Sequence, residues 1–216
     1  MGLRELKKEQ TRQLIADTAW RLFADRGFDQ VSVAEVARQA QVSEATVYNY
    51  FAAKEDLFYW RLEAFGTRLA EAVATRAAGE PALSAFRRAL LAEGGLLELA
   101  EEGDARALDR LRTVSQLITA SPALLAREQQ ALTQSASVLA GVLAADTRAV
   151  PGDLRPQVAA NAFIGAQRAL IDHVRSRVLG GDSLAGLAAE VRTLTVEAFE
   201  FLAHGLRDYA AKPAGS

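Results

Sequence analysis

The sequence contains no cysteine, which removes disulfide bonds, thiolate catalysis and zinc fingers from consideration. Only two histidines are present, His173 and His204, and they do not form the His-x-x-x-His pair of a metal-binding helix. A glycine-rich phosphate loop and a Gly-x-Ser-x-Gly elbow are also missing. An α-helical enzyme is the alternative class that these absences disfavour, and we expect no catalytic residue, no metal and no cofactor.

Long apolar runs are missing as well. No stretch reaches the roughly 18 apolar residues of a membrane span, and no apolar segment follows a basic N-terminus as in a secretory signal. The lack of cysteine agrees with a reducing compartment. We therefore expect a cytoplasmic protein with no membrane partner.

Aromatic residues make up only 7% of the 216 residues, whereas half of the chain is apolar and rich in alanine and leucine. Alanine and unbranched side chains lose little entropy in a helix, so this composition favours helices. The five prolines interrupt no long periodic segment, and no segment alternates apolar and polar residues as a strand does. We predict an all-α fold of about nine helices.

Apolar spacing and turn residues divide the chain. The basic stretch 4–12 is interpreted as a solvated first turn or a flexible arm. A helix follows it and ends near Gly27, and two short helices begin after Ser32 and Ser43. Six longer helices are predicted over 54–78, 82–100, 105–119, 122–145, 153–179 and 184–209. These elements predict a three-helix N-terminal domain (1–53), a second domain (54–211) and a disordered tail (212–216).

The two short helices have the pattern of a helix-turn-helix. Ser32 with Glu35 matches a capping box, and Ser43 can cap the second helix. Val47 and Phe51 lie four residues apart and are predicted to point inward, against the inner face of the first short helix. That inner face consists of Val36, Ala37 and Ala40.

The opposite face of the second short helix is then free to enter a DNA groove. Ala45, Tyr48 and Asn49 share it, at i, i+3 and i+4, and Glu44 and Thr46 flank it. Asparagine pairs bidentately with adenine, glutamate accepts from cytosine, and alanine contacts the thymine methyl. Phosphate contacts suit the hydroxyl groups of Thr46, Tyr48 and Tyr50 and the positive charge of Lys54.

The stretch from Arg12 to Leu57 closely resembles the TetR family of transcriptional regulators. The resemblance is carried by residues 22–28 (LFADRGF), 33–37 (VAEVA), 42–51 (VSEATVYNYF) and 54–57 (KEDL). It implies that Thr46, Tyr48, Tyr50 and Lys54 contact the DNA backbone, with Glu44, Ala45 and Asn49 nearest the bases. Gln41 stands where the family usually has a turn glycine. If its φ is positive, glutamine costs about 1 kcal/mol more than glycine there.

For the second domain, the resemblance implies a small-molecule pocket and a homodimer interface on the last two long helices. A row of small residues at helical spacing supports close helix packing. The predicted interface residues are Ala159, Ala162, Ala166, Ala169 and His173 on one helix and Leu187, Val191, Leu194 and Ala198 on the last. The alternative is a monomeric bundle that buries both rows internally.

The pocket residues are predicted from polar positions among apolar ones, namely Arg112, Gln116, Asn161 and Gln167. The stretch 154–178 is loosely similar to a subgroup related to the mycofactocin regulator, which implies acyl-CoA-type ligands. We expect a repressor that binds a palindromic double-stranded operator and is released by a small, largely apolar effector.

Charge alone does not identify the partner, because the net charge is −2. A helical protein-interaction module is therefore a third alternative. Such a module would have no DNA affinity and no salt-dependent binding, so a DNA titration at two salt concentrations separates it from the DNA-binding hypothesis.

Overall fold

A computed structural model describes residues 2–92, 105–181 and 186–205. Within these ranges the chain forms nine helices and no strand, which confirms the all-α prediction. They are α1 (Leu3–Arg26), α2 (Val33–Gln39), α3 (Glu44–Tyr50), α4 (Lys54–Ala74), α5 (Ala82–Leu91), α6 (Ala105–Ala120), α7 (Pro122–Thr147), α8 (Arg155–Leu179) and α9 (Leu187–His204).

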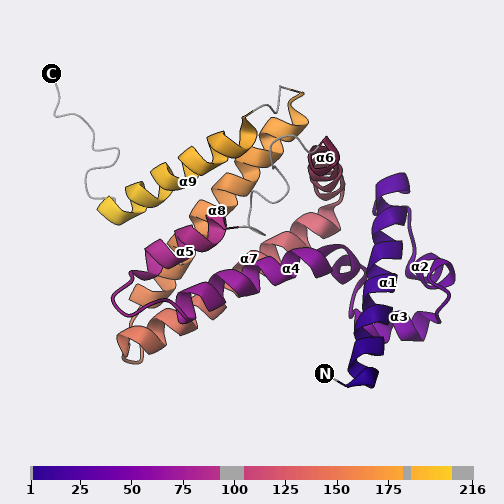
Figure 1. The fold of residues 1–216 in the computed structure, drawn as a ribbon, viewed down its shortest axis with the longest axis horizontal. Coiled ribbons are helices and arrows are strands. Elements are labelled where there is room, and N and C mark those ends of the chain that lie inside the picture. Colours follow the sequence, from indigo (N-terminus) through magenta and orange to yellow (C-terminus); the bar gives the residue numbers. More distant parts are fainter. Residues whose placement is uncertain (1, 93–104, 182–185, 206–216) are drawn as a thin grey trace.

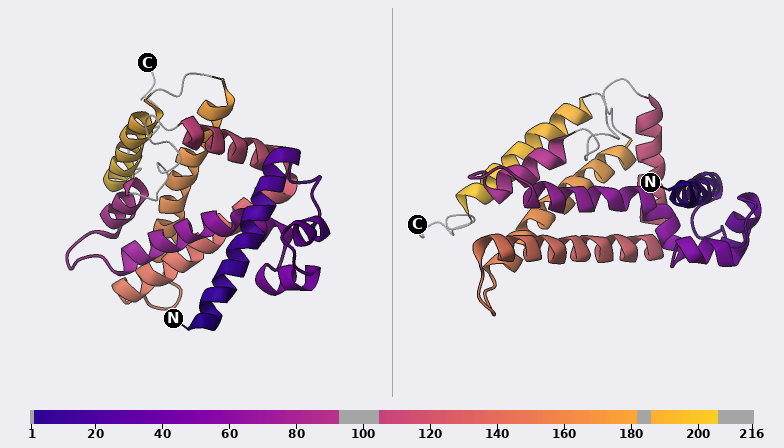
Figure 2. Two further views of the ribbon diagram at one scale, coloured as in Figure 1. Left: turned by 45° about the vertical axis from the view of Figure 1, so that its right-hand side comes forward. Right: turned by 60° about the horizontal axis from the view of Figure 1, so that its bottom comes forward.

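Helices α1 to α3 gather at one end of the molecule, and we call residues 2–53 the head (Figure 1). The remaining described residues, 54–92, 105–181 and 186–205, are called the body. Helices α4 and α7 run side by side away from the head, and α8 packs between α7 and α9. Helix α6 lies across the end of the body nearest the head (Figure 2). Among the described helices, none has the length and apolar character that crossing a membrane requires.

Several predicted helix boundaries differ from those of the structure. Helix α1 begins at Leu3, so residues 4–12 are turns of a helix and the flexible-arm interpretation is wrong. Helix α4 ends at Ala74, four residues before the predicted end at 78, and Thr75 is its C-cap. Helix α5 is described only to Leu91, so the rest of the segment predicted up to residue 100 lies outside the described residues, as does the predicted tail 212–216.

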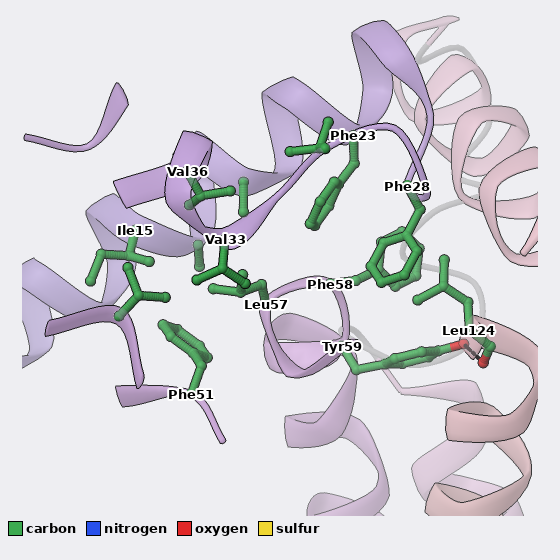
Figure 3. Close-up of a cluster of buried hydrophobic side chains, with 14 of the residues drawn as sticks. Ile15, Phe23, Phe28, Val33, Val36, Phe51, Leu57, Phe58, Tyr59 and Leu124 are labelled. Atoms are coloured by element: carbon green, nitrogen blue, oxygen red, sulfur yellow. Dashed lines mark hydrogen bonds between the residues drawn. The ribbon is translucent and has the colours of Figure 1, made fainter. Parts of the chain in front are cut away.

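The head has an aromatic core. Phe23 packs on Phe28 with ring centroids 4.9 Å apart, and Phe58 of α4 packs against Phe28 at 6.4 Å (Figure 3). The cluster continues into the body through buried residues of α4, α6 and α7, which are Leu57, Phe58, Tyr59, Leu117, Ile118 and Leu124. The head core is therefore completed by the nearest turns of the body, a little beyond the boundary at residue 53.

The body has two separate cores. The larger is built around Phe86, Phe163 and Phe199, whose rings lie 5.5–6.4 Å apart. The smaller joins α6, α8 and α9 through Leu111, Val174, Val178, Leu187, Ala188 and Val191. Helix α8 contributes to both cores, and the stretch of α8 between them includes the buried residues Gln167 and Leu170.

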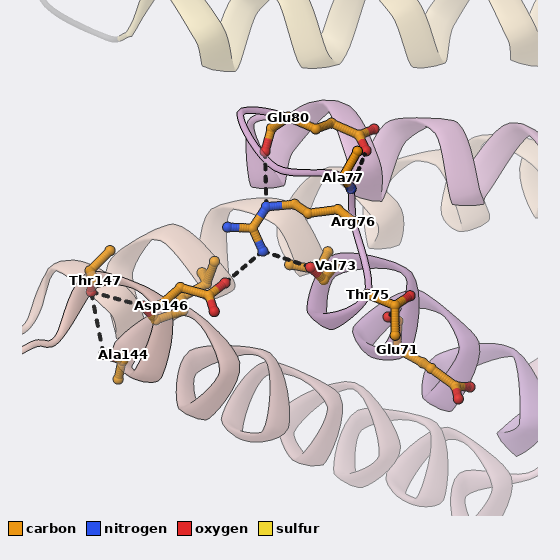
Figure 4. Close-up of polar contacts among 10 residues, drawn as sticks. Glu71, Val73, Thr75, Arg76, Ala77, Glu80, Ala144, Asp146 and Thr147 are labelled. Carbon is orange, nitrogen blue, oxygen red and sulfur yellow. Dashed lines mark hydrogen bonds and ion pairs between the residues drawn. The ribbon is translucent and has the colours of Figure 1, made fainter.

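The end of α4 farthest from the head is fixed by Arg76. Its guanidinium donates to Asp146 of α7 at 2.6 Å, to the Val73 carbonyl at 2.6 Å and to the Glu80 carbonyl at 2.9 Å (Figure 4). One side chain thus joins the end of α4, the start of α5 and the end of α7.

Candidate nucleic-acid interface

Helix α3 begins with the side-chain cap that the sequence predicts. Ser43 Oγ accepts from the Thr46 backbone N–H at 3.0 Å and lies 2.7 Å from the Thr46 hydroxyl oxygen. The cap satisfies one of the free N–H groups at the helix start and fixes where α3 begins.

The turn between α2 and α3 keeps the helix-ending geometry usually made by glycine. Gln41 has φ 57°, its N–H donates to the Arg38 carbonyl, and the Val42 N–H donates to the Ala37 carbonyl at 3.0 Å. These two bonds define a Schellman motif, which requires a left-handed residue at the position of Gln41. Glutamine therefore replaces glycine without changing the turn, at a cost in conformational energy.

Residues of α3, together with Phe51 that caps its C-terminus, divide between two faces as predicted. The inward residues Val47 and Phe51 are 1% and 3% exposed, and they pack into the head core. On the opposite face Tyr48 is 53% exposed, and Asn49 is also exposed. Glu44 and Ala45, in the first turn of α3, are exposed too. Four of the seven predicted DNA-contacting residues thus lie on one open surface.

The other three predicted contacts are half-buried. Tyr50 packs against the head core, and the Thr46 hydroxyl is engaged by Ser43. Lys54 Nζ lies 4.2 Å from the centroid of the Phe28 ring, and burial lowers the pKa of this ammonium group. The Phe28 ring therefore holds the Lys54 charge close to the start of α4.

The predicted capping box at α2 is only half formed. Ser32 Oγ accepts from the Glu35 N–H at 3.2 Å, as expected. The Glu35 carboxylate does not return to Ser32 but pairs with Arg26 at the end of α1. This hydrogen-bonded ion pair lowers the pKa of Glu35 and links α1 to α2 instead.

Comparisons with known proteins agree with this geometry. Residues 15–59 match the model of bacterial regulatory proteins of the tetR family, and residues 80–207 match the MftR C-terminal domain. The chain belongs to the TetR family. Residues 15–59 thus form the helix-turn-helix of this family of bacterial regulatory proteins, and the body is an MftR-type C-terminal domain.

Similar proteins include further regulators of this kind. The chain is 27% identical to the HTH-type transcriptional regulator TcmR of Streptomyces glaucescens over 67% of its own length and 63% of TcmR. It is 41% identical to AcrR of Shigella flexneri over 27% of its length and 29% of AcrR. Among solved structures, NalD, the secondary repressor of the MexAB-OprM multidrug efflux pump in Pseudomonas aeruginosa, is 20% identical. The two structures superpose with a TM-score of 0.55 over 88% of this chain and 97% of NalD. At 20% identity, this likeness shows a common fold alone.

Contacts that join the start of α7 to the head and to α4 of this TetR-family chain were not predicted. Ser121 directly precedes α7 and makes no side-chain cap there; its hydroxyl donates to Asp29 of the α1–α2 loop at 2.8 Å. The buried Tyr59 hydroxyl donates to the Leu124 carbonyl at 3.0 Å (Figure 3). Arg127 Nε donates to Asp56 at 3.0 Å. No short-range pattern could reveal these pairs, because their members are at least 65 residues apart in sequence.

The first turns of α7 also connect to α8. Arg175 donates to Glu128 at 2.6 Å, with both side chains mostly buried, and Arg168 donates to Gln129 at 2.8 Å. A groove of about 680 Å³ runs along the junction of α4 and α7, lined by residues that include Ala53, Asp56 and Arg127. Helix α7 thus contacts both the head and α8, as α6 also does.

Three of the four predicted effector residues are exposed rather than inside a pocket. Arg112 is exposed and pairs with Asp109 on its own helix, Gln116 is exposed, and exposed Asn161 accepts from Gln157. Gln167 is the exception, being 4% exposed with no hydrogen-bond partner for its Oε1 among the described residues.

The predicted dimer residues fall into three groups. Leu187 and Val191 are 1% and 0% exposed within a single chain, so a second copy cannot reach them. His173 Nε2 lies 2.8 Å from Glu190 of α9. The third group is only partly covered within one chain. Ala169 is exposed, and the half-buried members are Ala159, Ala162, Ala166, Leu194 and Ala198.

Proposed function

We propose that this TetR-family chain is a ligand-responsive repressor, which binds a palindromic operator as a homodimer and leaves it when a small, largely apolar effector binds the body. The observation that carries the operator-binding part is the division of α3, with Val47 and Phe51 buried and Tyr48 and Asn49 open. A recognition helix reads base edges with such an outward face in the major groove.

Within this surface, we assign base contacts to Glu44, Ala45 and Asn49, and phosphate contacts to Tyr48 with the half-buried residues Thr46, Tyr50 and Lys54. Selection of bound DNA from a random pool tests the assignment, and a two-fold symmetric consensus is the expected result. Recovery of no consensus would refute the proposed operator.

Asn49→Ala sharpens that test. It should relax discrimination at one base pair of each half-site by about 1–3 kcal/mol, since one bidentate contact is lost. The matched control is Gln134→Ala, which removes a side-chain amide from an exposed position of α7 and should leave the consensus unchanged.

For the homodimer, the supporting observation is the exposed side of α8. Ala169, Gly165 and Val158 are exposed there, and small residues allow two helices to approach closely. Ala169→Glu should shift the protein to monomers in sedimentation and weaken operator binding. Ala120→Glu, at an exposed alanine of α6, is the control that should keep the dimer. Dimers in both variants would place the interface elsewhere.

For the effector, the supporting observation is Gln167. Its unpaired, buried Oε1 lies on the stretch of α8 between the two body cores. A buried acceptor without a partner costs about 1–3 kcal/mol, so a largely apolar ligand with one hydrogen-bond donor would gain from meeting it.

The proposed switch is a shift between two conformations. The effector favours one in which α4 has moved, so that the two recognition helices no longer fit successive major grooves, and it acts only through its difference in affinity for the two states. A broad panel of apolar metabolites, acyl-CoA compounds included, should contain one that releases the operator. Gln167→Leu should bind DNA normally but respond less. A panel without any release would contradict the effector hypothesis.

A further inference from the structure

Arg12 of α1 lies between two aromatic rings. Its Cζ is 5.5 Å from the centroid of Phe51, which directly follows α3, and 5.8 Å from the centroid of Trp60 on α4. Arginine stacks on aromatic faces through its planar guanidinium, so two rings restrict its orientation more than one would. The charge of Arg12 is therefore positioned against the end of the recognition helix.

This arginine has no anionic partner among the described residues. Its Nε is buried and lacks an acceptor, and no carboxylate pairs with the guanidinium. Elsewhere in the described chain, partly buried arginines have such partners, as Arg76 has Asp146 and Arg175 has Glu128. Arginine is always charged, and a half-buried cation without a counter-charge favours an anion from outside the chain.

Lys8 extends the same feature by one helical turn. Residues four apart lie on one face of a helix, so Lys8 shares the face of Arg12. Lys8 is exposed, and no carboxylate pairs with it in the described part of the chain. The N-terminal end of α1 and helix α3 lie on the same side of the head (Figures 1 and 2). Both cations thus lie beside the surface that reads DNA.

We propose that Arg12 and Lys8 bind phosphates of the operator next to the groove that α3 enters, and so enlarge the DNA contact beyond the helix-turn-helix itself. The inference rests on the proposed operator binding. DNA phosphates are its expected anions because they flank every major groove, and arginine matches their geometry with paired N–H groups. Arg12 would then join α1, the end of α3 and the DNA backbone through one side chain.

The salt dependence of binding tests this inference. The logarithm of the association constant falls with the logarithm of salt concentration by about 0.9 per neutralised phosphate. Arg12→Gln and Lys8→Gln should each reduce this slope by about 0.9 per subunit, which is about 1.8 for a dimer, and weaken binding to all sequences alike. Arg12→Lys keeps the charge and should retain most of the slope.

Arg148→Gln is the matched control, because it removes an exposed charge at the far end of α7 and should leave the slope unchanged. Thermal melting of each variant identifies any loss of folding, and Lys8→Gln, at an exposed position outside every core, tests the contact without disturbing the stack. Unchanged slopes in Lys8→Gln and in folded Arg12→Gln would overturn the inference. If the unmodified protein bound no DNA, the proposed function itself would fail.

Discussion

The head and the body are both helical, but their cores are organised differently. The head has one aromatic cluster, which continues into α4, α6 and α7. The body has two clusters that α8 joins, with the unpaired Gln167 carbonyl between them. A continuous core makes the head move with the nearest ends of the body helices, whereas a divided core allows the body to rearrange internally.

The largest expected effect comes from breaking the continuous core. Phe23 is fully buried, so Phe23→Ala should lower the free energy of unfolding by about 3–5 kcal/mol. Both tryptophans, Trp20 and Trp60, pack against this cluster and report on it by fluorescence, while circular dichroism reports on all helices. The two signals should change together in urea, and separate transitions would show that the head folds independently of the body.

A smaller loss of stability is expected at the buried hydrogen bond between Tyr59 of the head core and Leu124 of α7. Tyr59→Phe leaves the Leu124 carbonyl without its 3.0 Å donor and should cost about 1–3 kcal/mol, measured by urea denaturation. Burial raises the pKa of Tyr59 well above its ordinary value of 10. Above about pH 10 the unfolded chain loses this proton first, so the native protein loses stability there and Tyr59→Phe does not. If the free energies of unfolding of the native protein and of Tyr59→Phe differed by the same amount across that pH range, the raised pKa of Tyr59 would be contradicted.

The ion pair between α4 and α7 should contribute less. Asp56 Oδ1 accepts from Arg127, and Oδ2 accepts from the Ala53 N–H that precedes α4. A double-mutant cycle of Asp56→Asn and Arg127→Gln should give a coupling energy of about 1 kcal/mol, because both side chains are only about one-fifth exposed. The more exposed pair of Arg88 and Glu80 serves as the control and should give less. Equal coupling in both cycles would remove any special role of the α4–α7 pair.

The smallest effect concerns the turn before α3. Gln41→Gly relieves a positive φ and should stabilise the protein by up to about 1 kcal/mol, partly offset by the greater freedom of glycine when unfolded. Gln39→Gly, two residues earlier and inside α2, should instead destabilise by about 1 kcal/mol. Thermal melting distinguishes the two signs, and a loss of stability in both would mean that Gln41 is not strained.

Features that depend on neighbours within four residues could be predicted before the fold was known. Helical spacing placed Val47 and Phe51 inward and Tyr48 and Asn49 outward, and the family motif identified the turn in which Gln41 is left-handed. Long-range contacts became visible only in the folded chain: Ser121 bonds Asp29, Arg12 lies between two rings, and Leu187 is buried within its own chain. Local periodicity shows which face of a helix is apolar, whereas the partner of that face depends on how helices distant in sequence pack together.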